Sequence, residues 1–286
     1  MPSTSRKFDS PHLRSIREKK IRKRKRVFYK LSILFCVFVV VLLVLLNLPF
    51  LRFDKVVVNG TKVLVANEVE EFVGTKIEGR LALILPRDSI VFYQKNEIES
   101  HLDVRFSRIE NVKFYRNGQT LLLRVKEYEG SYLWCGKDNL DTNQCYFLDS
   151  RGHIFDESPY FSGSAYLRFY GPSDIGRDEV LGTDFVDEET FSRLLGIVDK
   201  VEYLGFDVSR FTILKEKQVD ILVSVGGNDA HIYLLYDEKS DDRLNDLALA
   251  MTQEPLLSEK QNNFANLEYL DIRFDNKVYY KFSPTF

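Results

Sequence analysis

The pattern of apolar positions along the chain is dominated by one run at residues 31–48. Fifteen of its eighteen residues are Leu, Ile, Val or Phe, and only Ser32, Cys36 and Asn47 interrupt it. A helix of that length spans roughly 27 Å, close to the hydrocarbon thickness of a bilayer. A core helix of a soluble domain would carry a polar face, and this run has none. The pattern predicts a transmembrane helix, which we place at residues 31–51.

The charge on either side of this run predicts its orientation. Residues 1–30 hold twelve Lys or Arg and two acidic residues, a local charge of about +10, whereas the whole chain carries −2. Because positive flanks stay in the cytoplasm, residues 1–30 are expected to form a cytoplasmic basic tail and the later residues to lie outside. The chain would then be a single-pass, type II protein of the cytoplasmic membrane. A cleaved signal peptide is the alternative, although no small-x-small cleavage site follows the run.

The basic tail also indicates what the chain could bind, either a lipid bilayer or nucleic acid. Lys and Arg next to a membrane span contact anionic lipid head groups, each contributing about 1 kcal/mol. A run of this kind can also bind nucleic acid. Its position directly before the span favours the lipid bilayer as its partner and gives no support for nucleic acid.

Beyond the span, alternating and helical patterns predict a first folded segment at residues 52–129. The expected elements are a strand at 53–60, helices at 66–74 and 88–102, and strands at 109–115 and 120–127. Asp88 is the candidate N-cap of the second helix, and Gly74 is the expected end of the first. Asn117-Gly118 is a strong hairpin signal between the last two strands. The order is therefore βααββ.

A second folded segment is expected at residues 130–286. Strands are expected near 131–135, 145–149, 153–155, 166–170, 210–214, 220–225 and 231–236, helices at 187–204 and 241–251, and a final hairpin within 267–282. The helix at 187–204 has the clearest apolar stripe, with Asp187 as N-cap and Gly205 as its end. A long antiparallel sheet with helices packed on it fits this order, and the whole chain is expected to be α+β.

Two of the three cysteines lie outside the membrane. Cys135 and Cys145 flank a polar loop, and if the segments around them are the arms of a hairpin, their sulfurs can lie opposite each other. We expect a disulfide, which an extracytoplasmic environment permits. A metal pair is the alternative, but no His or Cys at ligand spacing accompanies them.

The basic tail, single anchor and βααββ unit, in this order, resemble the bacterial cell-division family FtsQ/DivIB. The matching motifs are Val56-Val57-Val58-Asn59-Gly60, Ile109-Glu110-Asn111-Val112-Lys113, Val125-Lys126-Glu127, and Tyr269-Leu270-Asp271-Ile272-Arg273-Phe274 followed by Val278-Tyr279-Tyr280. The chain departs from the family in lacking the usual Pro in the first hairpin turn. It also has Glu127-Tyr128-Glu129-Gly130 where the family commonly has Glu-Arg-x-Pro.

The resemblance implies a POTRA domain at residues 52–129 and a β domain at residues 130–286. It further implies a non-enzymatic scaffold of the divisome. Such a scaffold recruits and holds partner proteins at the outer face of the cytoplasmic membrane, at the division site, during septation. The partners implied are divisome membrane proteins, an FtsB/FtsL-like pair that binds the C-terminal strand.

The residues of the C-terminal strand also form a pattern that suits binding of a partner. A final strand has one neighbour in sequence, so its far side is expected to be an unpaired sheet edge. Alternation places Val278, Tyr280 and Phe282 on one face and Lys277, Tyr279 and Lys281 on the other. The expected partner-binding residues are Phe274, Lys277, Val278, Tyr279, Tyr280 and Lys281. In the alternative interpretation, Tyr280 packs into the sheet core.

The sequence carries no motif for catalysis. The four histidines (His12, His101, His153 and His231) fall in different elements, and neither a zinc-protease motif nor a nucleophile elbow nor a phosphate-binding loop is present. We therefore expect no enzyme activity, no cofactor, no metal site and no small-molecule substrate. Two alternatives stay open: a signal-anchored extracytoplasmic enzyme with a dispersed site, and a POTRA-containing component of protein transport. The transport alternative would need a series of barrel strands after the βααββ unit, and the sequence after that unit has no such series.

Overall fold

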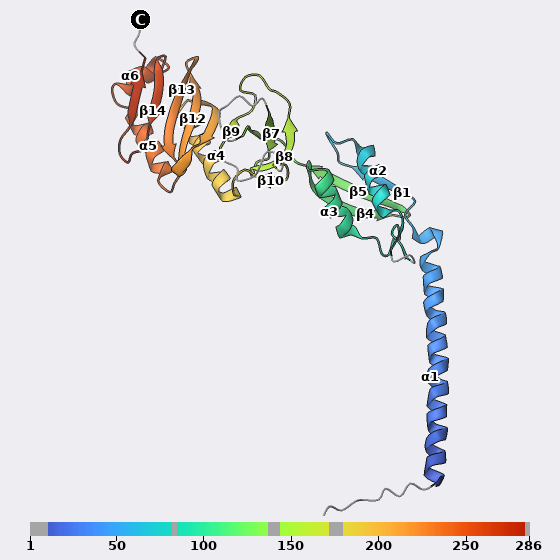
Figure 1. Cartoon of the computed structure of the whole chain (residues 1–286). Helices are drawn as coiled ribbons and strands as arrows, with labels where there is room; N and C mark the ends of the chain where they lie inside the picture. Colours follow the sequence, from blue (N-terminus) through green and yellow to red (C-terminus); the bar gives the residue numbers. More distant parts are fainter. Residues whose placement is uncertain (1–10, 82–84, 137–143, 172–179, 284–286) are drawn as a thin grey trace, which may run out of the picture. The chain divides into compact units, whose positions relative to one another are not determined.

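A computed structural model of the chain describes residues 11–81, 85–136, 144–171 and 180–283, with side chains from residue 23 onward apart from 81–85 (Figure 1). The chain divides into two compact units, one made of Met1–Leu102 and Val112–Val125, the other of Asp103–Asn111 and Lys126–Phe286. The expected α+β class is confirmed. The structure has an N-terminal apolar helix, a small sheet with helices, and a large sheet with helices.

The N-terminal helix, α1 (Pro11–Leu46), is 36 residues long and continuous from the basic tail into the apolar run. Its part Lys23–Leu46 has a mean hydropathy of 2.8 and is long and apolar enough to cross a membrane. Near its end, the Asn47 side chain donates to the carbonyl oxygen of Leu43 at 2.8 Å. An apolar helix of this kind suits a signal anchor or a signal sequence.

The small sheet has the strand, helix, helix, strand, strand order that the sequence predicts. Its elements are β1 (Lys55–Asn59), α2 (Ala66–Ile77), α3 (Lys95–Arg105), β4 (Ile109–Asn117) and β5 (Thr120–Glu127), with a short hairpin, β2 (Arg80–Leu81) and β3 (Leu85–Pro86), between the helices. The strand order is β1-β5-β4, and β1 runs parallel to β5. The edge of β1 is covered where the Val58 amide donates to the Glu70 carboxylate of α2 at 2.8 Å.

Both helices of this part differ from the predicted boundaries. Helix α2 continues past Gly74 to Ile77, because a glycine inside a helix costs only about 1 kcal/mol and does not by itself end it. Helix α3 begins at Lys95, seven residues later than predicted. Asp88 lies seven positions before this start and so does not cap the helix; its carboxylate binds the guanidinium of Arg52, with Nη2 and Oδ2 2.7 Å apart.

The large sheet has ten strands among the described residues, in the order β10-β8-β7-β6-β9-β11-β12-β13-β14-β15. Its strands are β6 (Tyr132–Trp134), β7 (Cys145–Leu148), β8 (His153–Ser158), β9 (Arg168–Tyr170), β10 (Thr183–Asp184), β11 (Asp207–Ile213), β12 (Gln218–Val225), β13 (Asn228–Leu235), β14 (Leu267–Asp271) and β15 (Tyr279–Phe282). Helices α4 (Glu188–Tyr203), α5 (Ser240–Ala250) and α6 (Leu256–Gln261) connect some of them.

The prediction of an antiparallel sheet was wrong, because the large sheet is mixed. The pairs β6–β9, β9–β11 and β13–β14 are parallel. Parallel neighbours need a crossover connection, and here α4 lies between β9 and β11 while α5 and α6 lie between β13 and β14. Alternation along a strand identifies its buried face but not the direction of its neighbour.

The three helices bury apolar side chains in one core with the strands of this sheet. The shared core includes Phe191, Leu194 and Val201 of α4, Leu244 and Leu247 of α5, Leu256 of α6, and Phe169, Phe211, Ile221, Ile232 and Leu270 of the strands. The predicted ends of α4 are confirmed. The Asp187 carboxylate accepts from the Thr190 amide at 2.9 Å, and Gly205 follows the helix with a φ of 98°.

Candidate functional site

The last hairpin of the chain forms the β15 end of the large sheet. Strand β15 pairs with β14 through Leu270↔Tyr280 and Asp271↔Tyr279, and no described strand pairs with its other side. In the turn, Asn276 has a φ of 59°, a left-handed conformation that Asn tolerates better than most residues. The structure therefore gives β15 the edge position expected from the sequence. Such an edge presents backbone N–H and C=O groups that can pair with another chain.

The register agrees with the predicted alternation of side chains. Tyr280 lies opposite the fully buried Leu270, and Val278 and Phe282 pack half-buried against the same core. Tyr279 lies opposite Asp271 and so points to the other face. Tyr280 is 39% exposed, so it is not buried in the core as the alternative interpretation required.

Three aromatic side chains are exposed at this edge. Phe274 is 51% and Tyr279 is 49% exposed, and their rings meet edge to face with centroids 5.4 Å apart. Tyr280 contacts Phe282, with centroids 5.5 Å apart. Large aromatic side chains dominate core and interface energetics. Exposed aromatic rings on both faces of a sheet edge are therefore suited to binding.

The two lysines of the strand have different surroundings. Lys281 forms an ion pair with Glu268 of β14, and the hydrogen bond between them raises the pKa of Lys281. The backbone amide of Lys277 donates to the Phe274 carbonyl oxygen at 3.4 Å, and its side chain is exposed. Exposed ion pairs of this kind contribute about 0–1 kcal/mol, so Lys281 can exchange its partner at little cost.

An arginine fixes the position of Phe274. The Arg273 guanidinium holds the Asp271 carboxylate at both oxygens, at 2.9 and 2.6 Å, and this raises the pKa of Arg273. It also donates to Gln218 of β12 at 3.0 Å. Its Cζ atom lies 6.0 Å from the ring centroid of Phe274 and 5.5 Å from that of Tyr233. Phe274 therefore lies against a guanidinium that residues of β14 and β12 hold in place.

A second set of charges fixes the turn of the hairpin to the start of α5. Asp275 binds Lys239 at 2.6 Å and Arg243 at 3.2 Å, and Arg243 binds Asp237 at 2.6 Å. The Arg243 side chain is only 6% exposed. The hydrogen bond from Arg243 lowers the pKa of Asp237, and the one from Lys239 lowers that of Asp275.

Sequence reasoning did not identify this brace, which we define as Asp237, Lys239, Arg243 and Asp275. The one signal available was Arg243 itself, which stands four residues before the buried Leu247 and hence on the same helix face. A cation on an apolar stripe needs a buried partner. The sequence could not identify Asp275 as that partner, since it lies 32 residues further along the chain.

The open face of the sheet beside this edge carries a second group of aromatic and charged side chains. His231 and Tyr233 of β13 stack at 5.8 Å, and Tyr233 contacts Tyr269 of β14 at 6.1 Å. The His231 imidazole lies 2.7 Å from the Asp220 carboxylate. These residues extend the candidate surface from the edge strand onto the sheet face.

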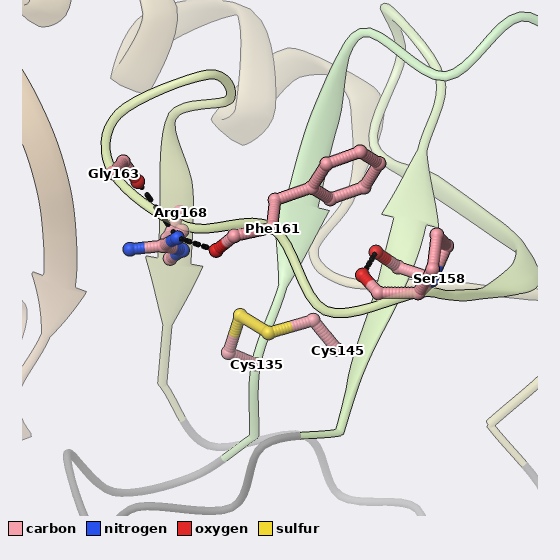
Figure 2. Close-up of a disulfide and its surroundings, with 7 residues drawn as sticks. Cys135, Cys145, Ser158, Phe161, Gly163 and Arg168 are labelled. Carbon is pink, nitrogen blue, oxygen red and sulfur yellow. Dashed lines mark hydrogen bonds between the residues drawn. A yellow bond between two sulfur atoms is a disulfide. The ribbon is translucent and has the colours of Figure 1, made fainter.

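The expected disulfide joins Cys135, at the end of β6, to Cys145, at the start of β7 (Figure 2). Their Cα atoms are 4.2 Å apart, and ten positions separate them in the sequence. Nearby, the Arg168 guanidinium donates to the carbonyl oxygens of Phe161 and Gly163, at 2.8 Å each (Figure 2). The disulfide therefore closes the end of two adjacent strands, away from β15 in the strand order.

The chemistry at the candidate site is that of recognition. The edge offers backbone pairing, exposed aromatic rings and exchangeable ion pairs. Among the residues that the structure describes, no group of three or more His, Cys, Asp or Glu side chains is placed to hold a metal ion.

Comparison with known proteins adds no relative: the chain matches no family model, and no curated protein matches it significantly.

Proposed function

We propose that the chain is a non-enzymatic, single-pass scaffold of the bacterial divisome, similar to the FtsQ/DivIB family. In this proposal the basic tail lies in the cytoplasm, α1 anchors the chain, and the folded units lie outside at the division site. An FtsB/FtsL-like pair docks on β15. The observation that carries the proposal is the edge strand β15 with its exposed aromatic side chains, the Phe274–Tyr279 pair on one face and Tyr280 on the other.

Exposure of these rings costs free energy that a partner would recover. Burying an aromatic side chain of this size contributes about 1.5–3 kcal/mol. The Arg273–Asp271 ion pair and the brace around Arg243 hold the hairpin in place before binding. Less conformational entropy is therefore lost on association. Addition of a strand at the edge would supply backbone hydrogen bonds, and the aromatic rings would supply the anchors.

The small sheet supports the proposal of a POTRA domain. Its order β1-β5-β4, with β1 parallel to β5 and two helices between β1 and β4, agrees with the βααββ unit on which the resemblance rests. The single apolar helix before it supports the anchor. Fold alone does not establish function, so the partner surface remains the decisive feature.

Localisation in dividing cells tests this function directly. A fluorescent protein fused before residue 1 should gather at mid-cell during constriction, and depletion of the chain should produce filamentous cells. The matched comparison is a fusion with Phe274→Ala, Tyr279→Ala and Tyr280→Ala, which should reach the membrane but fail to restore division. A uniform distribution of the unaltered fusion along the envelope throughout the cell cycle would contradict the proposal.

A further inference from the structure

The segment that follows α1 is bound to the small-sheet part of the first unit. The Arg52 guanidinium holds the Asp88 carboxylate with Nε–Oδ1 at 3.0 Å and Nη2–Oδ2 at 2.7 Å. The backbone amide of Ile90 donates to the Leu51 carbonyl oxygen at 2.9 Å, and that of Phe53 donates to the Asp88 carbonyl oxygen at 2.8 Å. An antiparallel bridge joins Arg52 and Ser89.

Further contacts make this connection rigid. Phe53 is buried, at 7% exposure, and its ring meets Tyr93 edge to face at 5.4 Å. The side chain of Gln119, in the turn between β4 and β5, donates to the Pro49 carbonyl oxygen at 2.9 Å. Residues 49–53 are therefore part of the folded unit.

This arrangement places three large apolar side chains on the surface of the unit. Phe50 is 60%, Val91 is 56% and Phe92 is 48% exposed. In the antiparallel arrangement around Arg52 and Ser89, Phe50 and Val91 are the next residues beyond the hydrogen-bonded pair Leu51 and Ile90. We call these three residues the juxtamembrane patch.

Chain connectivity limits how far the patch can lie from the end of α1. Phe50 follows Leu48, the last residue of the apolar run, by two positions, which is at most about 7 Å of extended chain. The head-group layer of a bilayer is of similar thickness, since the hydrocarbon core is about 30 Å and the whole bilayer about 40–45 Å. The hydrogen bonds of Leu51 and Phe53 keep Val91 and Phe92 close to Phe50.

We propose that the juxtamembrane patch inserts into the outer head-group layer of the membrane that α1 spans, so that the small-sheet part of the first unit lies on the bilayer surface in a fixed orientation. The inference rests on the anchor assigned to α1 under the proposed function. Aromatic and aliphatic side chains are favoured at this depth, where they leave water without losing hydrogen bonds. Continuity with α1 favours lipid over a protein partner, because the connecting chain is too short to carry Phe50 away from the bilayer.

Tryptophan fluorescence of the full chain in vesicles tests this insertion. The protein is reconstituted in phosphatidylethanolamine and phosphatidylglycerol with part of the acyl chains brominated. Phe92→Trp and Phe50→Trp are two independent probes, and circular dichroism checks that each variant is folded. The native Trp134 is buried, at 2% exposure, and serves as a constant reference that is subtracted.

Val63→Trp is the matched control, since Val63 is 64% exposed and lies in the same unit beyond the far end of β1. We expect both patch probes to emit at shorter wavelength than the control, to lose most of their fluorescence to brominated lipid, and to resist iodide added to the water. The control should respond to iodide and not to brominated lipid.

Three outcomes would overturn the inference. The patch probes could respond to iodide as the control does. They could be shielded from both quenchers, which would mean that protein covers the patch. The control could be quenched by brominated lipid as strongly as the probes are. Flotation of the vesicles after an alkaline wash tests the anchor separately, so a chain that stays bound with unquenched probes contradicts only the patch.

Discussion

Replacing Arg243 with alanine should destabilise the second unit by about 2–3 kcal/mol. Removing one member of a fully buried ion pair costs about 3–5 kcal/mol. Arg243 is 6% exposed, but its partners Asp237 and Asp275 are 30% and 48% exposed, so water screens part of that loss. The Nε of Arg243 has no hydrogen-bond partner in the described part of the chain, which also reduces the net stabilisation.

Urea unfolding of residues 49–286, which lack α1, measures this change. The chain has one tryptophan, Trp134, which lies in the core of the second unit and reports its unfolding. The matched control is Arg193→Ala, since Arg193 forms an exposed pair with Glu189 on helix α4 and should cost less than about 0.5 kcal/mol. If Arg243→Ala lowers the free energy of unfolding by no more than the control does, the stabilising role of the brace is refuted.

The pH dependence of the same difference provides a second readout. Arg243 lowers the pKa of Asp237 below its ordinary value of 3.8 in the folded state. The stabilisation is therefore fully present at pH values above 3.8, and it is lost as the pH falls through the lowered pKa of Asp237 in the folded state. The advantage of the unaltered protein over Arg243→Ala should be constant near neutral pH and should shrink in acid.

Two further changes test the covalent and backbone constraints. Replacing Cys135 and Cys145 by serine should lower the unfolding free energy of the second unit by about 2–3 kcal/mol, because the ten-position loop is no longer closed in the unfolded chain. An unchanged urea midpoint would contradict this. In the first unit, Gly60→Ala should lower the melting temperature more than Gly79→Ala. Both glycines have φ near 95°, at 94° and 97°, but only at Gly60 would a Cβ meet a carbonyl oxygen, that of Val125. Equal effects in thermal melts would contradict the steric argument.

The sequence predicted the elements whose signals are local. The helix α4 follows from its apolar stripe with Asp187 before it and Gly205 after it, and the first hairpin follows from Asn117-Gly118. The alternation of β15 could likewise be predicted, because side chains along a strand point to opposite faces whatever the neighbours are.

Features that depend on distant residues could not be predicted. The parallel pairs of the large sheet depend on which strand each crossover returns to, and the period of a strand does not contain that information. The contact of the Asp88 carboxylate with Arg52, 36 residues away in the sequence, is one such feature. At the candidate site, the exposure of Tyr280 and the brace around Arg243 depend on packing between separate elements.

Binding of an FtsB/FtsL-like pair from the same cell to residues 49–286 is the most direct test of the proposed scaffold. We predict that deleting residues 277–286, or changing Tyr280 to alanine, abolishes or greatly weakens binding while Trp134 fluorescence shows the second unit still folded. Tyr203→Ala is the control, because Tyr203 is 91% exposed on α4 and should leave affinity unchanged. A folded deletion variant that binds the pair with unaltered affinity would contradict the assignment of β15 as the docking edge.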